Sequence, residues 1–256
     1  MKFPDVAAQN IGHSSTTSCC SCPLRKISIF QPHGHGLMDF VKSRKVGEMR
    51  IAAGTVLFTQ GAHLQRMYSV LEGVGLRKRS PVNGELKAIS FLLPGDFIGL
   101  QRDQGHGVSF GVEATSDMTF CVFDRSDMHA GLRKNPDLLQ ELTWLAAREE
   151  NLLAEVLSVN AQLSGTQTIA WALLLLFRHL KATGVGGQDV VPLPYRQKDL
   201  AEALGLSLVH ANKTLARLRK QGMIDWRGGF LHIPSLEAVA DFVDVDLSQT
   251  APRPFL

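Results

Sequence analysis

The chain has 256 residues, of which 45% are hydrophobic and 20% are charged, so it can bury a sizeable core and divide into two domains. This composition excludes disorder as the overall state. The formal net charge of +3 is too small to indicate a nucleic-acid partner, so a basic surface has to be sought locally. The longest apolar run, Ile169 to Phe177, is less than half of the roughly 20 residues that a membrane-spanning helix needs, and we expect a cytoplasmic protein without a membrane partner.

The first 18 residues are polar and have no apolar period, which predicts a flexible N-terminal segment over 1–18. Three of the four cysteines follow directly as Cys19, Cys20 and Cys22, and the fourth is Cys121. A secreted disulfide protein has an even, dispersed set of cysteines instead. The clustering therefore favours metal binding or redox sensing.

Between residues 46 and 127, short runs of β-branched and aromatic residues alternate with Gly, Pro and Asn turn residues. The clearest runs are Thr55–Phe58, Met67–Leu71 and Thr119–Phe123. The turns are spaced close to the roughly 8 to 12 residues that separate strands in an all-β barrel or sandwich. The pattern predicts a small β-domain, which together with the cysteine segment covers residues 19–136.

After Pro136 the strand pattern stops, and a long helix is predicted over residues 137–164. Eight of its residues follow alternating steps of four and three and so lie on one stripe of the helix; they are Leu138, Leu142, Leu145, Glu149, Leu152, Val156, Val159 and Leu163. The stripe packs against its own β-domain or forms the seam of a two-helix dimer, and its length and strict alternation favour the dimer. Two copies of Glu149 facing each other would oppose association unless the site is solvated, paired or protonated.

Residues 165–247 form the predicted second domain, and 248–256 form a tail. Within this domain two amphipathic helices are separated by a very short turn that ends at Ser207, a suitable N-cap for a helix over Leu208–Lys220. The second helix has an apolar inward stripe and a basic outer face. Two short strands around the Arg227–Gly229 turn then predict a wing. This combination predicts DNA binding, because the major groove admits such a helix and its first turns reach the base edges.

Several motifs resemble the β-roll of cyclic-nucleotide-binding proteins: Gly54-Thr-Val-Leu-Phe, Tyr68-Ser-Val-Leu-Glu-Gly, the Asn83-Gly84-Glu85 turn and Leu93-Pro-Gly-Asp-Phe-Ile-Gly-Leu. Joined to a long helix and a winged helix-turn-helix, they resemble the Crp/Fnr superfamily of bacterial transcription regulators over nearly the whole chain. The resemblance implies an α+β fold with an N-terminal cyclic-nucleotide-binding-like β-roll, a long dimerisation helix and a C-terminal winged helix-turn-helix. It also implies a homodimer that binds double-stranded DNA with two-fold related half-sites, and RNA polymerase as a further partner.

The same resemblance assigns roles on the second helix of the helix-turn-helix. It implies that Leu208, Val209 and Lys213 read bases, and that Ser207 and His210 lie nearer the phosphates. The exposed polar set is completed by Asn212 and Arg217. Relatives commonly have a Glu in place of Val209 and an Arg in place of Lys213. Since Val209 accepts no hydrogen bond but can contact a thymine methyl group, we expect the target sequence to differ from the usual half-site of the family.

The effector is not expected to be a cyclic nucleotide. In the cyclic-AMP receptor branch a Gly-Glu pair holds the ribose and an Arg-Ser pair holds the phosphate, whereas the matching positions here are Gly99-Leu100 and Val108-Ser109. Without the carboxylate and the guanidinium, burying the phosphate charge would be costly.

The cysteines resemble those of the oxygen-sensing branch, the fumarate and nitrate reduction regulators, which bind an iron–sulfur cluster through N-terminal cysteines and one cysteine in the β-roll. The resemblance implies a cluster held by ligands among Cys19, Cys20, Cys22 and Cys121, because thiolates are the usual ligands of such clusters. The third N-terminal cysteine of that branch is missing, since the segment after Cys22 reads Pro-Leu-Arg-Lys-Ile-Ser. The fourth ligand would come from Cys20, from a histidine among His13, His33 and His35, or would not exist.

Other sensing chemistries stay open. They are thiol oxidation, zinc, another small ligand such as haem at His106, or no effector at all. If Cys121 is not a ligand, it is a small buried apolar residue of a strand. No Gly-x-Ser-x-Gly, phosphate-binding Gly-Lys-Ser/Thr or His-Glu-x-x-His motif occurs, so we do not expect an enzyme.

Overall fold

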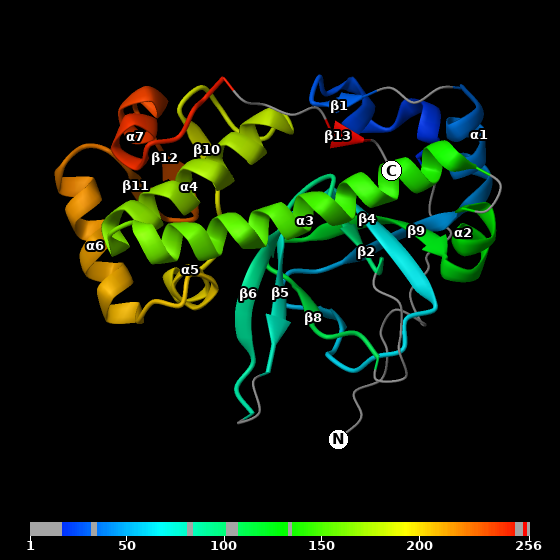
Figure 1. Cartoon of the computed structure of the whole chain (residues 1–256), viewed down its shortest axis with the longest axis horizontal. Coiled ribbons are helices and arrows are strands. Elements are labelled where there is room, and N and C mark those ends of the chain that lie inside the picture. The colour runs from blue at the N-terminus through cyan, green and yellow to red at the C-terminus, as the bar shows by residue number, and fades with distance from the viewer. Residues whose placement is uncertain are drawn as a thin grey trace. The chain divides into compact units, whose positions relative to one another are not determined.

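The computed structural model describes residues 17–31, 35–80, 84–100, 107–132, 135–248 and 253–254. They divide into two compact units (Figure 1). Unit 1 takes the described residues within Met1–Leu86, Ser90–Glu149 and Pro252–Leu256, and unit 2 takes those within Lys87–Ile89 and Glu150–Ala251. The predicted α+β architecture is confirmed, with a β-rich N-terminal part, a long helix and a C-terminal helix-turn-helix.

Two four-stranded sheets make up the β-rich part, in the orders β2-β9-β4-β7 and β3-β8-β5-β6. The strands are β2 (Lys45–Ile51), β3 (Val56–Phe58), β4 (Arg66–Glu72), β5 (Gly75–Arg79), β6 (Lys87–Leu92), β7 (Phe97–Ile98), β8 (Gly111–Ala114) and β9 (Met118–Asp124). Strand β9 pairs antiparallel with both β2 and β4, so it lies in the middle of its sheet. The strands predicted around residues 55, 67 and 119 correspond to β3, β4 and β9.

The sheet that contains β9 is buried on both faces, and alternation along its strands decides which core each side chain joins. One cluster takes Met67 and Leu71 from β4 together with Cys121 and Phe123 from β9. The other takes Tyr68, Val70, Phe120 and Val122 from the same two strands. Cys121 is therefore only 7% exposed and faces the cluster that also contains Cys19 and Cys22.

The remaining elements of unit 1 are short. They are the 3-10 turns η2 (Cys19–Ser21) and η3 (Pro23–Lys26), β1 (Phe30–Gln31), α1 (His35–Arg44), α2 (Arg125–Leu132) and β13 (Arg253–Pro254). β1 and β13 pair in parallel although they come from opposite ends of the sequence (Figure 1). Part of the predicted C-terminal tail thus forms a strand beside the segment that follows the cysteines.

The long helix predicted after Pro136 is α3 (Pro136–Gln162), whose residues up to Glu149 count with unit 1 and the rest with unit 2. Leu138, Leu142 and Leu145 are 0%, 7% and 5% exposed and belong to the same core cluster as Cys121. The expectation that these three leucines form a dimer seam is therefore wrong. A side chain buried within its own domain has no surface left for a second chain, so this part of the stripe follows the alternative of packing against the β-domain.

Glu149 is paired within the chain. Its carboxylate accepts hydrogen bonds from Arg77 Nη1 at 2.9 Å and Arg77 Nη2 at 3.3 Å, so among the alternatives raised for Glu149 the structure has the paired one. The rest of the predicted seam is half-buried, and its role stays a prediction; these residues are Leu152, Val156, Val159 and Leu163. The exposed leucines of α3 lie elsewhere on the helix: Leu139, Leu153 and Leu157 are 52%, 58% and 71% exposed.

Unit 2 contains α4 (Gly165–Ala182), β10 (Val190–Pro192), α5 (Gln197–Ala203), α6 (Leu208–Lys220), β11 (Asp225–Arg227), β12 (Phe230–His232) and α7 (Leu236–Val243). Helix α4 begins with a capping box, in which the Ser164 side chain and the Gln167 side chain each bond the other's backbone N–H group. It contacts α6 and α7 and is buried along most of its length. In the described part of the chain, no helix is both long and apolar enough to cross a lipid bilayer.

Candidate functional sites

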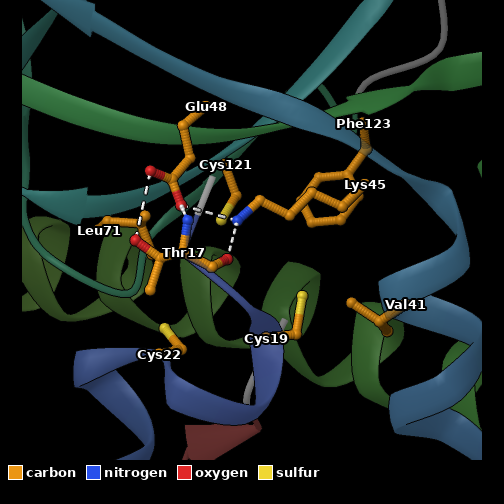
Figure 2. Close-up of a pocket in the computed structure, with 9 residues that line it drawn as sticks. All are labelled: Thr17, Cys19, Cys22, Val41, Lys45, Glu48, Leu71, Cys121 and Phe123. Atoms are coloured by element: carbon orange, nitrogen blue, oxygen red, sulfur yellow. Dashed lines mark hydrogen bonds and ion pairs between the residues drawn. The ribbon is translucent and has the colours of Figure 1, made fainter. Parts of the chain in front are cut away.

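Three of the four cysteines meet at one cavity in unit 1. Cys19 and Cys22, from the segment of η2, and Cys121, from β9, line it together, about 100 positions apart in the sequence (Figure 2). They are 6%, 5% and 7% exposed, whereas Cys20 is exposed. The structure thus brings together three of the predicted ligands and leaves out Cys20.

The local geometry of the cysteine segment explains this selection. Ser18 caps the turn, since its hydroxyl accepts a hydrogen bond from the Cys20 N–H group at 3.3 Å. A 3-10 turn has three residues per turn, so side chains three positions apart lie on the same side. Cys19 and Cys22 therefore both face the cavity, and Cys20 between them faces outward.

The cavity is small and has a polar side. Its volume is about 10 Å³, roughly the space that one water molecule occupies. Beside the three thiols it is lined by Lys45 and Glu48, and by Thr17, Val41, Leu71 and Phe123. Within the described ranges, no three His, Cys, Asp or Glu side chains form a group that could hold a metal ion. A single-ion site, such as one for zinc, finds no support there.

Burial sets the acidity of the three thiols. It raises the pKa of Cys121 to about 12, because desolvation outweighs the lowering effect of the nearby Lys45 ammonium. Burial also raises the pKa of Cys19 and of Cys22. At neutral pH these groups are thiols in the metal-free protein, and thiols are poor nucleophiles compared with thiolates.

The other candidate ligands give no support in the described part of the chain. His13, His33 and His106 lie outside the described residues, and so does Asn83 of the predicted turn. His35 begins α1, but its side chain also lies outside what the structure describes.

The positions compared with the cyclic-nucleotide branch lie in two places. Leu100 packs against the core cluster that contains Cys19, Cys22 and Cys121, whereas Val108 and Ser109 lie away from the cysteine cavity. Ser109 lines an open depression of unit 1 together with Val108, Thr59, Gln60 and Ser80, and none of its described lining residues is charged. Among these described residues there is no guanidinium for a phosphate, and the expectation of no cyclic nucleotide stays a prediction.

Sequence reasoning missed Lys45 and Glu48, the charged residues of the cysteine cavity. Residues three apart on a regular strand point to opposite faces, so the two were not expected to meet. The register of β2 against β9 shifts between Lys45 and Gly47, which inserts Val46 as an extra residue and turns Lys45 to the same face as Glu48. An isolated glycine within a strand signals such a bulge, and Gly47 carried that signal.

In unit 2, the helix-turn-helix has the predicted form. Helix α5 is followed by a short turn, and the Ser207 hydroxyl caps α6 by accepting a hydrogen bond from the His210 N–H group at 3.2 Å. The inward stripe is buried as expected at Ala211, Leu215 and Leu218, and Thr214 joins it.

The outer face of α6 is exposed among the described residues. Every residue predicted to meet DNA is exposed, namely Ser207, Leu208, Val209, His210, Asn212, Lys213 and Arg217. Leu208 and Val209 are 43% and 64% exposed, so the start of α6 has an apolar surface beside its polar groups. The His210 ring lies toward Gly165 at the start of α4, because a Cβ atom on that glycine would be 2.3 Å from His210 Nε2. DNA contact by these residues stays a prediction.

The predicted wing is the hairpin of β11 and β12. Gly228 and Gly229 both have positive φ, the conformation that a tight two-residue hairpin turn requires. A third strand, β10, pairs with β12 and was not predicted. The Trp226 indole N–H group donates to the Leu193 carbonyl at 3.0 Å, which fixes the hairpin to the segment after β10.

Comparisons with known proteins agree with both halves of this description. A model of the cyclic nucleotide-binding domain matches residues 48–135, and a model of the Crp-like helix-turn-helix domain matches residues 167–242. The nitrogen fixation regulation protein FixK of Bradyrhizobium diazoefficiens is 28% identical over 210 residues, which cover 80% of this chain and 85% of that protein. The transcriptional activator protein FnrL of Cereibacter sphaeroides is 24% identical over 213 residues, covering 82% and 85%.

A solved structure with the same fold is that of FixK2 from Bradyrhizobium japonicum. It has a TM-score of 0.67 at 19% sequence identity and covers 76% of this chain and 95% of that one. At this identity the likeness concerns the fold alone.

Proposed function

This chain belongs to the Crp/Fnr family of DNA-binding transcription regulators, and from that premise we propose that it senses oxygen or redox state through an iron–sulfur cluster at its cysteine cavity. The relatives are transcription regulators and not enzymes. The observation that carries the proposal is the meeting of Cys19, Cys22 and Cys121 at one buried cavity.

The donor chemistry at the cavity fits a cluster. Three thiols are soft ligands that become anionic when they bind a metal, which suits iron–sulfur chemistry, and a cluster spreads its ligands over several irons where a zinc ion needs them on one atom. Cys19, Cys22 and Cys121 would hold the cluster, which supplies a centre that changes with oxygen or redox state. Within the described residues no fourth ligand joins them, so it would come from outside those residues or not exist.

Thiol oxidation without a metal has less support. It needs thiolates that are accessible, and burial both covers Cys19, Cys22 and Cys121 and raises the pKa of each. A metal removes this obstacle, because its positive charge replaces the proton on each bound thiol.

We propose further that the chain acts as a homodimer on DNA with two-fold related half-sites, as Crp/Fnr regulators bind DNA as dimers. Leu153 and Leu157 are four residues apart and so lie on one face of α3, where an apolar contact with a second copy would cover them. Two recognition helices then meet successive major-groove turns about 34 Å apart. RNA polymerase as a partner stays a prediction.

The proposed DNA target follows from the exposed start of α6. Leu208 and Val209 offer apolar contacts to thymine methyl groups, and Lys213 offers a donor to guanine. A carboxylate at position 209 would accept a hydrogen bond from cytosine instead. The half-site is therefore expected to be richer in A·T pairs at the position that Val209 reaches.

Anaerobic purification with iron and sulfide reconstitution tests the sensor. We expect brown protein with broad absorbance in the near-visible range and bound iron and sulfide, all lost in Cys22→Ser and Cys121→Ser. The matched control is Cys20→Ser, which removes an exposed thiol of the same segment and should keep the cluster. Colourless wild-type protein after reconstitution would remove the cluster from the proposal.

A further inference from the structure

A buried ion pair lies beside the cysteines. Lys45 Nζ is 2.7 Å from Glu48 Oε1, and the two side chains are only 8% and 6% exposed. Both enter the cavity because the bulge at Val46 puts them on one face of β2. Glu48 is also the cross-strand partner of Cys121, so its side chain leaves the sheet on the same face as that thiol.

This ion pair binds the main chain of the cysteine segment. The Thr17 N–H group donates to Glu48 Oε1 at 2.9 Å, and the Thr17 carbonyl accepts from Lys45 Nζ at 2.8 Å. The Thr17 hydroxyl lies 3.4 Å from Glu48 Oε2 (Figure 2). The backbone N–H group and the carbonyl of Thr17, two positions before Cys19, are thus both held by side chains of β2.

Stability alone does not account for such a pair. Removing two charges from water costs several kcal/mol per ion, and well-packed apolar side chains of similar volume are often as stable. An apolar pair could not form hydrogen bonds with the Thr17 N–H group and the Thr17 carbonyl, as Glu48 and Lys45 do. The geometry therefore assigns the pair to the fixing of this backbone.

We propose that Lys45 and Glu48 are positioning residues, which hold the turn that carries Cys19 and Cys22 against Cys121, so that breaking the pair opens the thiol cavity. The inference explains what holds the proposed sensor site in place, and to that extent it rests on the proposed function. The anchoring itself needs no cluster, so it can be tested on metal-free protein.

Thiol alkylation with N-ethylmaleimide, followed residue by residue by peptide mass spectrometry, measures the opening in the reduced, metal-free full chain. In the wild type Cys20 reacts quickly, and Cys19, Cys22 and Cys121 react slowly. In Lys45→Met the three buried thiols are expected to react about tenfold faster or more, because a loss of 1.4 kcal/mol of protection is a factor of ten. The reactivity of Cys20 stays unchanged.

The matched control is Lys78→Met, which breaks the ion pair of Lys78 Nζ with Glu113 Oε2 (2.6 Å) in the other sheet of the same domain. It loses a comparable pair without touching the cavity, so the buried thiols should stay protected. Equal opening in Lys78→Met, or unchanged rates in a folded Lys45→Met, would overturn the inference.

A second variant keeps the test decisive if Lys45→Met does not fold. Glu48→Gln keeps an acceptor for the Thr17 N–H group and removes only the charge that holds Lys45, so it should fold and still speed alkylation of Cys19 and Cys22. A Glu48→Gln protein with wild-type rates would contradict the proposal. Failure of iron uptake by the wild type would instead concern the sensor function and leave these rates as they are.

Discussion

Replacing Glu149 with Ala should destabilise the β-rich unit 1 and not strengthen a dimer. The carboxylate makes two hydrogen bonds with Arg77, a guanidinium that is only 7% exposed, so its loss leaves a buried charge unpaired. Such a loss typically costs ~3–5 kcal/mol. Because Glu149 itself is 35% exposed and Arg77 also contacts Ser90 and the Phe110 ring, we expect about 2 kcal/mol.

Arg77→Met should cost less, about 1 kcal/mol or below, since it removes the buried charge itself and leaves only the Glu149 carboxylate, which is 35% exposed and can be hydrated. It also removes a buried Nε atom that has no hydrogen-bond partner among the described residues. Urea denaturation followed by circular dichroism measures both, and 2 kcal/mol corresponds to a midpoint shift of about 1 M for a typical slope. Glu150→Ala, the exposed neighbour, is the control and should stay within ~0.5 kcal/mol. A stable Glu149→Ala protein that associates more tightly would refute this account and restore Glu149 to a dimer seam.

Three further outcomes are expected. Lys213→Ala should weaken specific DNA binding in a mobility-shift assay by about 1–3 kcal/mol and non-specific binding much less, whereas equal losses would reduce Lys213 to a phosphate contact. Leu157→Lys should shift sedimentation toward monomer without changing the circular dichroism spectrum, and an unchanged dimer would place the interface elsewhere. Gly73→Ala should lower the free energy of unfolding in urea by at least ~2 kcal/mol more than Gly54→Ala does. Both glycines have φ near +81°, but only at Gly73 would an added Cβ atom meet the Asp117 carbonyl oxygen, at 2.0 Å. Equal losses would show that the clash is relieved.

Most of the fold could be predicted because its signals are local. The caps, turns and periodicity of α6 and of the wing are read from neighbouring residues, and they correspond to the structure. The apolar stripe of α3 shows what local signals do not predict. Periodicity identifies the apolar face of a helix, but it does not say whether the covering surface belongs to the same chain. Leu138, Leu142 and Leu145 are covered by their own domain.

The cysteine cavity could be predicted only in part. Spacing and resemblance selected Cys19, Cys22 and Cys121, yet Cys20 could not be set aside without knowing that the segment forms a 3-10 turn. Glu48 was missed for a different reason, since a charged residue in a strand is ordinarily expected at the surface. Its burial depends on a bulge and on a hydrogen-bond partner that comes from a distant part of the chain.

The parallel pairing of β1 with β13 bears on how the protein is made. A ribosome synthesises Phe30 early and Arg253 only after most of the described chain has emerged. Strand β1, which follows the cysteine segment, can therefore pair with β13 only late in synthesis. Until then that segment relies on Thr17 and the packing around it. The packing around the cysteine segment is thereby expected to be complete only after Arg253 has left the ribosome, a delay that pulse-labelled nascent chains would reveal.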